Sequence, residues 1–397
     1  MSRSAFRLVP PAGAPVPART VLPSILAGAG GAAGLVAERL GVRQPFFVSS
    51  GRAALTLVLQ AMREHSHRSE VIIPAYTCFS VASAVARAGL SIRLCDVAPG
   101  TLDLDRDALA RLDLDRALCI VPSGLYGLPS DLVWLVSRAG SAGAFVVDDA
   151  AQCLGATLDG RQCGTFGDAG FFSLGRGKGI TTMGGGILVT SREDLARSIQ
   201  RQLATLRRPS LGEVGVAVGT SLLYSGLLRP SLYWLVDRLP FLELGASHFD
   251  PDFPMSRLST YQEALVEQVL PLVDAYNKAR RDNADHLRAG LEGVDGIELP
   301  RPVAGASPVY LRFPILTRGD AHRSLLRQRL RDAGISASTS YPTPIGDIPG
   351  IGRYLASGQM ECPAASAIAT RILTLPTHPW VTTQDIERMV AVVRNHS

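Results

Sequence analysis

Three absences restrict what this chain of 397 residues can be. Its six cysteines form no CxxC pair and show no spacing typical of a zinc site or a disulfide framework, so we expect free thiols and no bound metal. No apolar run of signal-peptide length follows the charged start, which argues against export. The most apolar stretch, residues 214–228, is shorter than the ~20 residues that a membrane-spanning helix needs. The sequence therefore predicts a protein of the reducing cytoplasm.

Lysine is also nearly absent: Lys178 and Lys278 are the only two among 40 lysines and arginines. Arginine has taken almost every position that needs only a positive charge. Its guanidinium has a pKa above ~12 and cannot act as a neutral amine, whereas a lysine amine can be deprotonated and attack a carbonyl. A lysine in a chain that uses arginine at almost every other basic position therefore indicates amine chemistry. Lys278, beside Arg280 and Arg281 in a predicted helix, is better interpreted as a residue of the polar face.

The formal net charge of +5 does not favour a nucleic-acid partner. Basic residues alternate with acids, as in the run from Asp320 to Asp332, and do not gather into one block. No nucleic-acid-binding motif accompanies them. We expect a solvated basic surface on an ordinary globular protein.

Short apolar runs alternate with helix-like stretches between residues 46 and 190, a pattern typical of an α/β domain with a mostly parallel sheet flanked by helices. Ligands usually bind at the carboxyl edge of such a sheet. The predicted strands are 46–48, 70–73, 91–95, 118–121, 144–147, 169–172 and 186–189.

A long helix from Tyr261 to about Leu291 should lead into a smaller C-terminal α+β domain. That domain is expected to contain a strand at 309–315, a helix near 321–333 and a last helix from Gln384. We divide the chain into an N-terminal arm (1–24), a large domain (25–260) with an apolar insert (about 211–253), and the linking helix with the small domain (261–397).

Lys178 lies just after a predicted strand, in the segment FFSLGRGKG (171–179). Glycines on both sides of it let the backbone approach a bulky planar ligand closely. An amine in this setting could form an imine with an aldehyde. A solvated loop lysine is the alternative that the local sequence leaves open.

Two acids, Asp148 and Asp149, end the predicted strand 144–147. Successive side chains of a strand point to opposite faces, so the two cannot share a direction. A carboxylate beside the ring nitrogen is what an electron-accepting pyridine cofactor needs, and we assign this role to Asp149, with Asp148 turned toward the backbone or another partner. Gln152 would lie one helical turn on and could reach the ring. Alternatively, the acids only cap a helix.

The segment SSGRAAL (49–55) follows a strand and opens an Ala/Leu-rich helix. Free N–H groups and the helix dipole favour a phosphate there, with Gly51 giving access to the backbone. Arg52 could add a charged contact or point to solvent, and Ser173 offers a hydroxyl at the same edge of the sheet. Such a turn is often a plain connection, so this assignment depends on Lys178 and Asp149.

Together these segments resemble the DegT/StrS-type family of pyridoxal-phosphate aminotransferases, which have fold type I and are best known for aminating nucleotide-linked keto-sugars. The resemblance spans most of the chain. Its pieces are SSGRAAL (49–55), VIIPAYT (71–77), LYG (125–127) with Asp131, VDDAAQCLGA (147–156), GDAGFFSLGRGK (167–178), RLSTYQEAL (257–265), CPAA (362–365) and RILTLPTHP (371–379).

The resemblance implies a role for each candidate residue. Lys178 would form the Schiff base with pyridoxal 5'-phosphate and act as the general base, and Asp149 would hold the pyridinium nitrogen. Gln152 would contact the cofactor ring. The phosphate would be bound by Gly51, Arg52 and Ser173. The family also implies a homodimer with shared active sites.

Several positions near the substrate depart from the family pattern. Tyr76 or Phe79 could take over the stacking role of an aromatic that the family places on the cofactor ring. At the position of Met255 the family has an Asn that commonly reaches the neighbouring subunit's cofactor. The departures are Arg52 for Thr or Ser, Cys78 for the stacking aromatic, Gly124 for His and Met255 for Asn.

We therefore expect an aminotransferase that moves an amino group from a donor such as glutamate to a keto or aldehyde acceptor, either a sugar nucleotide or a secondary metabolite. The apolar insert is predicted to form helices that cover the active-site mouth, or dock on a membrane or partner protein, or make an ordinary buried contact. Two alternatives stay open: a non-transaminating pyridoxal-phosphate enzyme, although sugar dehydratases of this group typically have histidine at the position of Lys178, and a non-catalytic binding protein.

Overall fold

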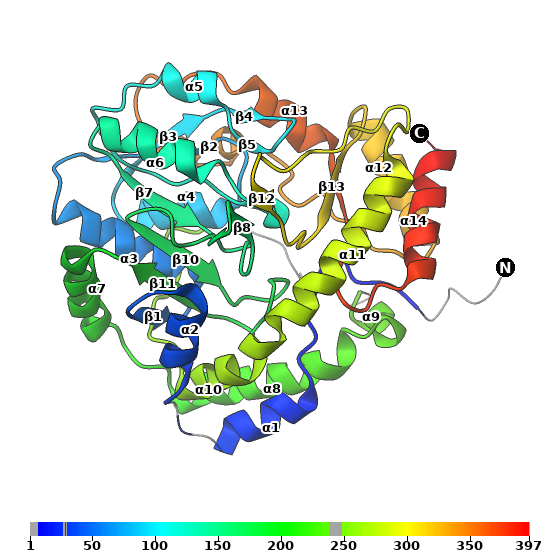
Figure 1. The fold of residues 1–397 in the computed structure, drawn as a ribbon, viewed down its shortest axis with the longest axis horizontal. Helices are drawn as coiled ribbons and strands as arrows, with labels where there is room; N and C mark the ends of the chain where they lie inside the picture. Colours follow the sequence, from blue (N-terminus) through cyan, green and yellow to red (C-terminus); the bar gives the residue numbers. More distant parts are fainter. Residues whose placement is uncertain (1–6, 27, 29, 238–247, 397) are drawn as a thin grey trace.

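The computed structural model describes residues 7–26, 28, 30–237 and 248–396 (Figure 1). Its centre is a seven-stranded sheet in the order β1-β11-β10-β7-β6-β2-β3. The strands from β10 to β3 run parallel, whereas β11 is antiparallel to both β10 and β1. All seven predicted strands are confirmed: β1 Pro45–Val48, β2 Glu70–Pro74, β3 Ser91–Cys95, β6 Ala117–Ile120, β7 Phe145–Asp149, β10 Ala169–Ser173 and β11 Gly186–Thr190.

Successive side chains of the strands pack into separate cores on the two faces of the sheet. In β10, Phe171 belongs to the core that includes residues of α3 (Gly51–Arg63), α4 (Phe79–Arg87) and α7 (Glu193–Thr205). Phe172 belongs to the core on the other face, with residues of α2 (Ala32–Leu40) and α10 (Thr260–Val269). Because both faces are covered, the strands are apolar at almost every position, which made them visible in the sequence. The helices of this region are α2 Ala32–Leu40, α3 Gly51–Arg63, α4 Phe79–Arg87, α5 Arg106–Ala110, α6 Leu132–Ser141 and α7 Glu193–Thr205.

Short elements connect these layers without adding to the main sheet. They are the pair β4 Val97–Ala98 and β5 Asp103–Leu104, the 3-10 turn η1 Leu125–Gly127, and the strands β8 Thr157–Leu158, β9 Arg161–Gln162 and β12 Ala306–Ser307, which form a sheet in the order β12-β8-β9.

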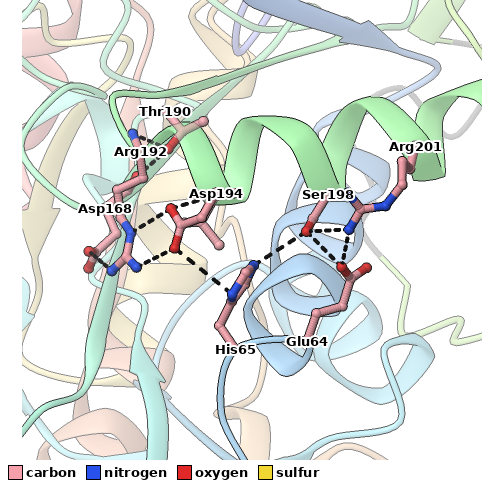
Figure 2. Close-up of polar contacts among 9 residues, drawn as sticks. Glu64, His65, Asp168, Thr190, Arg192, Asp194, Ser198 and Arg201 are labelled. Atoms are coloured by element: carbon pink, nitrogen blue, oxygen red, sulfur yellow. Dashed lines mark hydrogen bonds and ion pairs between the residues drawn. The ribbon is translucent and has the colours of Figure 1, made fainter.

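A polar network fixes α7 at the edge of the sheet opposite the carboxyl ends of the parallel strands (Figure 2). Arg192 donates to Asp168, directly before β10 (3.1 Å), and to Asp194 in the first turn of α7 (2.5 Å). Further along α7, Ser198 Oγ donates to Glu64 at the end of α3 (2.6 Å). Hydrogen bonding from Arg192 holds the pKa of Asp194 at about 2. The network therefore ties α7 to both α3 and β10.

The predicted long helix is wrong in one respect, because it is two helices. α10 Thr260–Val269 and α11 Val273–Leu291 are separated by the 3-10 turn η3 Leu270–Leu272. Pro271 lies in this turn, and a proline has no N–H for the helical ladder. On α11, Lys278 is exposed, as its assignment to the polar face predicts, and pairs with Asp282 (2.6 Å), whereas its neighbour Arg280 is fully buried.

The C-terminal part contains the two-stranded antiparallel sheet of β13 Phe313–Leu316 and β14 Ile372–Leu375. The strand predicted at 309–315 thus begins four residues later, because Tyr310 has φ +46° and cannot continue a strand. The remaining elements are α12 Asp320–Asp332, η4 Ile345–Asp347, η5 Ile351–Tyr354, α13 Pro363–Arg371 and α14 Thr383–Asn395. The division of the chain into arm, large domain and small domain stays a prediction.

The apolar insert forms the predicted helices in its described part, as α8 Leu211–Leu227 and α9 Pro230–Asp237. Residues 238–247 of the insert, and residues 1–6 of the predicted arm, lie outside the described residues. α1 Ala18–Leu26 packs against α8 and α10 (Figure 1). Among the helices that the structure describes, none has the length and apolarity to cross a bilayer.

Candidate active site

A cavity of about 250 Å³ lies at the carboxyl ends of β6, β7 and β10. These strand ends bring together loops that are far apart in sequence, as parallel sheets commonly do at ligand sites. The walls come from both the large sheet and the C-terminal part. All seven residues singled out from the sequence line it: Gly51, Arg52, Cys78, Asp149, Gln152, Ser173 and Lys178.

Lys178 is carried by the loop between β10 and β11. Gly177 precedes it with φ +77°, a left-handed conformation that glycine adopts without strain, and Lys178 N donates to Gly175 O (3.3 Å). At the base of the loop, Thr182 N donates to Leu174 O (3.0 Å). The glycines thus form a tight turn that places the amine at the cavity wall.

Burial lowers the pKa of the Lys178 amine below its ordinary value. Cys78 and Asp149 oppose this shift, and Arg312 adds to it. An amine whose pKa is lowered spends more time in the neutral form, which is the form that attacks a carbonyl or removes a proton.

Asp149, at the end of β7, is buried and held at both oxygens. Oδ1 accepts from Ala151 N (3.0 Å) and Oδ2 from Ser123 Oγ (3.2 Å). Burial raises the pKa of this carboxyl, while these hydrogen bonds and the charge of Lys178 lower it. Lys178 and Asp149 are therefore close enough to stabilise each other's charged form across one cavity.

The neighbouring Asp148 points away from the cavity, as strand alternation predicts. Its Oδ2 accepts from Gly164 N (2.5 Å), and burial raises its pKa to about 7. The segment after the two acids is a turn, so the alternative that they cap a helix does not hold. Gln152 accordingly does not lie one helical turn beyond Asp149, which corrects our expectation about its position.

Gln152 links the sheet to the C-terminal part of the chain. Its Oε1 accepts from Tyr126 N (3.1 Å), and its Nε2 donates to the Tyr341 hydroxyl (3.3 Å). Tyr341 lines the cavity. Tyr76 and Phe79, which we considered as stacking residues, are not among the lining residues and pack against Tyr341 instead, with ring centroids 5.9 and 6.0 Å away.

The first turn of α3 meets the end of β10 at the other side of the cavity. Ser50 caps the helix by accepting from Ala53 N (3.2 Å). A Cβ on Gly51 would lie 3.0 Å from Ser173 Cβ, so a side chain here would require the two segments to move apart by a few tenths of an ångström. Backbone N–H groups of α3 and the Ser173 hydroxyl thereby converge where we predicted a phosphate.

Arg52 lines the cavity, but its guanidinium also has protein partners. It stacks on Phe253, 4.3 Å from the ring centroid, and lies 3.6 Å from Asp250. Burial lowers its pKa, and Asp250 opposes the shift. The predicted phosphate contact would therefore compete with this pair.

The structure explains one departure from the family pattern. A Cβ on Gly124 would lie 2.3 Å from Cys153 Sγ, so a histidine cannot replace this glycine unless the thiol moves. Cys153 is itself fixed by donating to Gly124 O (3.2 Å). Met255 does not line the cavity; it lies in a separate hollow near α7.

Sequence reasoning missed several residues of the cavity wall. Ser123 follows β6 as Lys178 follows β10, so the rule of strand ends could have found it. Arg312 and Tyr341 come from loops of the C-terminal part, where no local signal marks them. Within the described residues, Arg312 Nε is buried without a hydrogen-bond partner, and Nη1 donates at long range to the hydroxyls of Ser338 and Ser340 (3.5 Å each).

Known proteins resemble this chain over most of its length. Residues 34–394 match the model of the DegT/DnrJ/EryC1/StrS aminotransferase family. UDP-N-acetyl-3-dehydro-alpha-D-glucosamine 3-aminotransferase from Acidithiobacillus ferrooxidans is 30% identical over 362 residues, covering 90% of this chain and 86% of that protein. A dTDP-3-amino-3,4,6-trideoxy-alpha-D-glucose transaminase from Streptomyces venezuelae is 28% identical, covering 87% and 81%.

Solved structures show the same fold. The sugar aminotransferase CalS13 from Micromonospora echinospora has a TM-score of 0.76 at 25% identity, covering 98% of this chain and 100% of CalS13. DesV from S. venezuelae has a TM-score of 0.76 at 24% identity, covering 95% and 93%.

Proposed function

The chain belongs to the DegT/DnrJ/EryC1/StrS aminotransferase family, and from this premise we propose that it transfers an amino group from glutamate to a keto-sugar nucleotide. Its cofactor is pyridoxal 5'-phosphate, the cofactor of this family. The observation that carries the proposal is that Lys178 and Asp149 line one cavity, where each opposes the shift that burial causes in the other's pKa.

The residues present fit this cofactor. A close approach of Gly51 and Ser173 forms a cradle of backbone N–H groups and one hydroxyl for the phosphate. The buried carboxyl of Asp149 suits the ring nitrogen, and Lys178 suits the aldehyde. When bound, the cofactor supplies an aldehyde for the lysine amine and a ring that accepts electrons from the α-carbon of the donor.

The protein groups then have separable tasks. We assign to Lys178 Nζ both the covalent attachment and the transfer of the proton of the donor's α-carbon. Asp149, oriented by Ser123 and Ala151, keeps the ring nitrogen protonated. Gln152 holds Tyr341, which also lines the cavity, through its hydrogen bond to the hydroxyl.

The acceptor is proposed from the chemistry of the wall and from the relatives. Arg312, with its unpaired Nε, and the exposed Arg176 place positive charge at the cavity, which suits an acceptor that carries a diphosphate. Relatives named for UDP-sugar and dTDP-sugar amination favour the same class. The amino donor is proposed as glutamate from the family resemblance alone.

Two further properties belong to this proposal. We expect a homodimer, as the family resemblance implies. We also place the enzyme in a reducing cytoplasm, which is supported by six free cysteines.

The half-reaction with glutamate tests the proposal. Purified holoenzyme mixed with glutamate should release 2-oxoglutarate and lose the absorbance of the lysine-bound cofactor, and a keto-sugar nucleotide should restore that absorbance. Lys178→Ala should slow the release roughly a thousandfold. Lys278→Ala, at the exposed lysine, is the matched control and should keep the wild-type rate. Release of 2-oxoglutarate at the full rate by Lys178→Ala would contradict the proposal.

A further inference from the structure

Three helices expose apolar side chains at one end of the molecule. α1 contacts α8, and α8 contacts α9, so the three form a continuous surface (Figure 1). We call it the apolar face and define it by six exposed residues, Leu22 and Leu26 of α1, Val216, Leu222 and Leu223 of α8, and Leu235 of α9. Leu26 is 90% exposed and Val216 70%. Exposed apolar residues gathered on adjoining helices mark a contact surface.

α8 is oriented against the usual rule for a surface helix, which buries its apolar side. The side chains that it buries are Ser221 and Tyr224, whereas Leu223 is 63% exposed. Tyr224 lies beside Gly177, in the loop that carries Lys178. The inward face of α8 thus contacts the active-site loop, whereas Leu211, Leu222 and Leu223 are exposed. Exposing them to water is unfavourable unless another surface covers them.

The border of the apolar face is positively charged. Arg19 in α1, Arg208 before α8 and Arg229 after it are all exposed. Glu213 is the only acid in α1 and α8, and both of its oxygens are taken by Arg207 (2.7 Å each). An apolar centre with an arginine border is complementary to a bilayer that carries anionic headgroups.

We propose that the apolar face docks the enzyme on an anionic lipid bilayer, with the leucines in the interfacial region and the arginines at the headgroup phosphates. A second copy of the chain fits less well. A two-fold interface would set this face against itself, and α1 and α8 offer no free carboxylate to the arginines of the border. A bilayer supplies an apolar layer for the leucines and anionic phosphates for the arginines.

Docking in this way brings the active site close to the bilayer. Arg176 lines the catalytic cavity and also a second hollow whose wall includes Val214 and Ala217 of α8. The mouth of the cavity therefore lies beside the helix that contacts the lipid. This inference goes beyond amino transfer itself and does not depend on the identity of the acceptor.

Co-sedimentation with lipid vesicles tests the proposal on the full-length holoenzyme. We expect binding to vesicles that contain phosphatidylglycerol, weaker binding to pure phosphatidylcholine, and release at high salt. The double variant Leu222→Glu/Leu223→Glu should lose binding by more than about tenfold, and Arg208→Gln/Arg229→Gln should weaken it roughly fivefold for each arginine.

Val133→Glu on α6 and Leu325→Glu on α12 are matched controls, because they make the same change at exposed apolar residues on other helices (52% and 42% exposed). Both should bind vesicles as the wild type does. Cofactor absorbance and the glutamate half-reaction show that each variant is folded. The proposal is overturned if the wild type stays in solution with anionic vesicles, or if the double variant binds normally. If the wild type does not bind vesicles and the double variant no longer forms the dimer, the apolar face is instead an interface with a second copy of the chain.

Discussion

At the scale of single residues, the alternation of side chains along β7 gives the neighbours Asp148 and Asp149 different partners, although both are buried. Asp149 faces the cavity with its charge supported by Lys178, whereas Asp148 faces the backbone of Gly164. The carboxylate of Asp149 is thus available to a cofactor, whereas that of Asp148 stabilises the backbone around Gly164.

Asp149→Asn should therefore slow 2-oxoglutarate release by about a hundredfold or more, because the amide cannot keep the ring nitrogen protonated. Asp148→Asn is the matched control, since its amide oxygen can still accept from Gly164 N, and we expect it to retain most of the activity. Single-turnover rates with glutamate measure both. Equal losses in the two variants would show that Asp149 has no special role.

Asp148 also predicts how stability depends on pH. Burial raises its pKa from 3.8 to about 7, so the folded state keeps a proton that the unfolded state releases. Its contribution to stability is present at low pH and is lost as the pH rises from about 4 to about 7. Asp148→Asn removes this dependence. The thermal midpoint of the variant minus that of the wild type should increase over this pH range, and a difference that stays constant would refute the assignment.

The residues proposed as catalytic, which line the cavity, could be picked from the sequence because a single chemical reason marks each of them. Lys178 stands out because arginine fills nearly every other basic position, and Asp149 because only one of two strand-end acids can face the cavity. Tyr341 and Arg312 could not be predicted, since the packing of the C-terminal part against the sheet brings them to the cavity. The position of Gln152 was predicted wrongly because a turn, and not a helix, follows Asp149.

At the scale of elements, the contact between α3 and β10 positions the proposed phosphate site. Gly51→Ala would place a Cβ 3.0 Å from Ser173 Cβ and push the first turn of α3 away. We expect roughly tenfold weaker cofactor affinity with a small change in stability. Gly34→Ala in α2, where nothing lies within 4 Å of the new Cβ, should leave the affinity unchanged. Cofactor titration of the apoenzyme measures both, and unaltered binding by Gly51→Ala would rule out this cradle.

The elements themselves followed from the sequence to the extent that burial alone determines them. Strands covered on both faces leave continuous apolar runs, so all seven were found. The break between α10 and α11 depends on Pro271, which the apolar pattern around it hides. The start of β13 depends on the positive φ of Tyr310, a conformation that side-chain type does not reveal.

At the scale of the whole molecule, Arg280 joins three distant segments. Its guanidinium donates to Asn277 Oδ1 on the same helix (3.0 Å), to Gly179 O next to Lys178 (2.9 Å) and to Gly13 O near the N-terminus (3.3 Å). Burial lowers its pKa to about 10, which still leaves it charged at neutral pH. The sequence pattern of α11 gave no sign of this role.

Arg280→Met should leave these acceptors without a donor and lower the free energy of unfolding by about 1–3 kcal/mol. Lys278→Met, at an exposed position of the same helix, should change it little. Urea unfolding of both variants decides the matter. An unchanged or higher midpoint for Arg280→Met would contradict this prediction. It would mean that removing the buried charge stabilises the fold by at least as much as the lost hydrogen bonds did.

The attachment of the cofactor to Lys178 can be tested directly, because the chain has only one other lysine, Lys278. Borohydride reduces a carbon–nitrogen double bond and so fixes the cofactor permanently on the amine that holds it. Peptide mapping of the reduced holoenzyme should find the label on the peptide that contains Lys178 and none on the peptide that contains Lys278. A label on Lys278, or the absence of any label when the cofactor is fully bound, would show that Lys178 does not carry the cofactor.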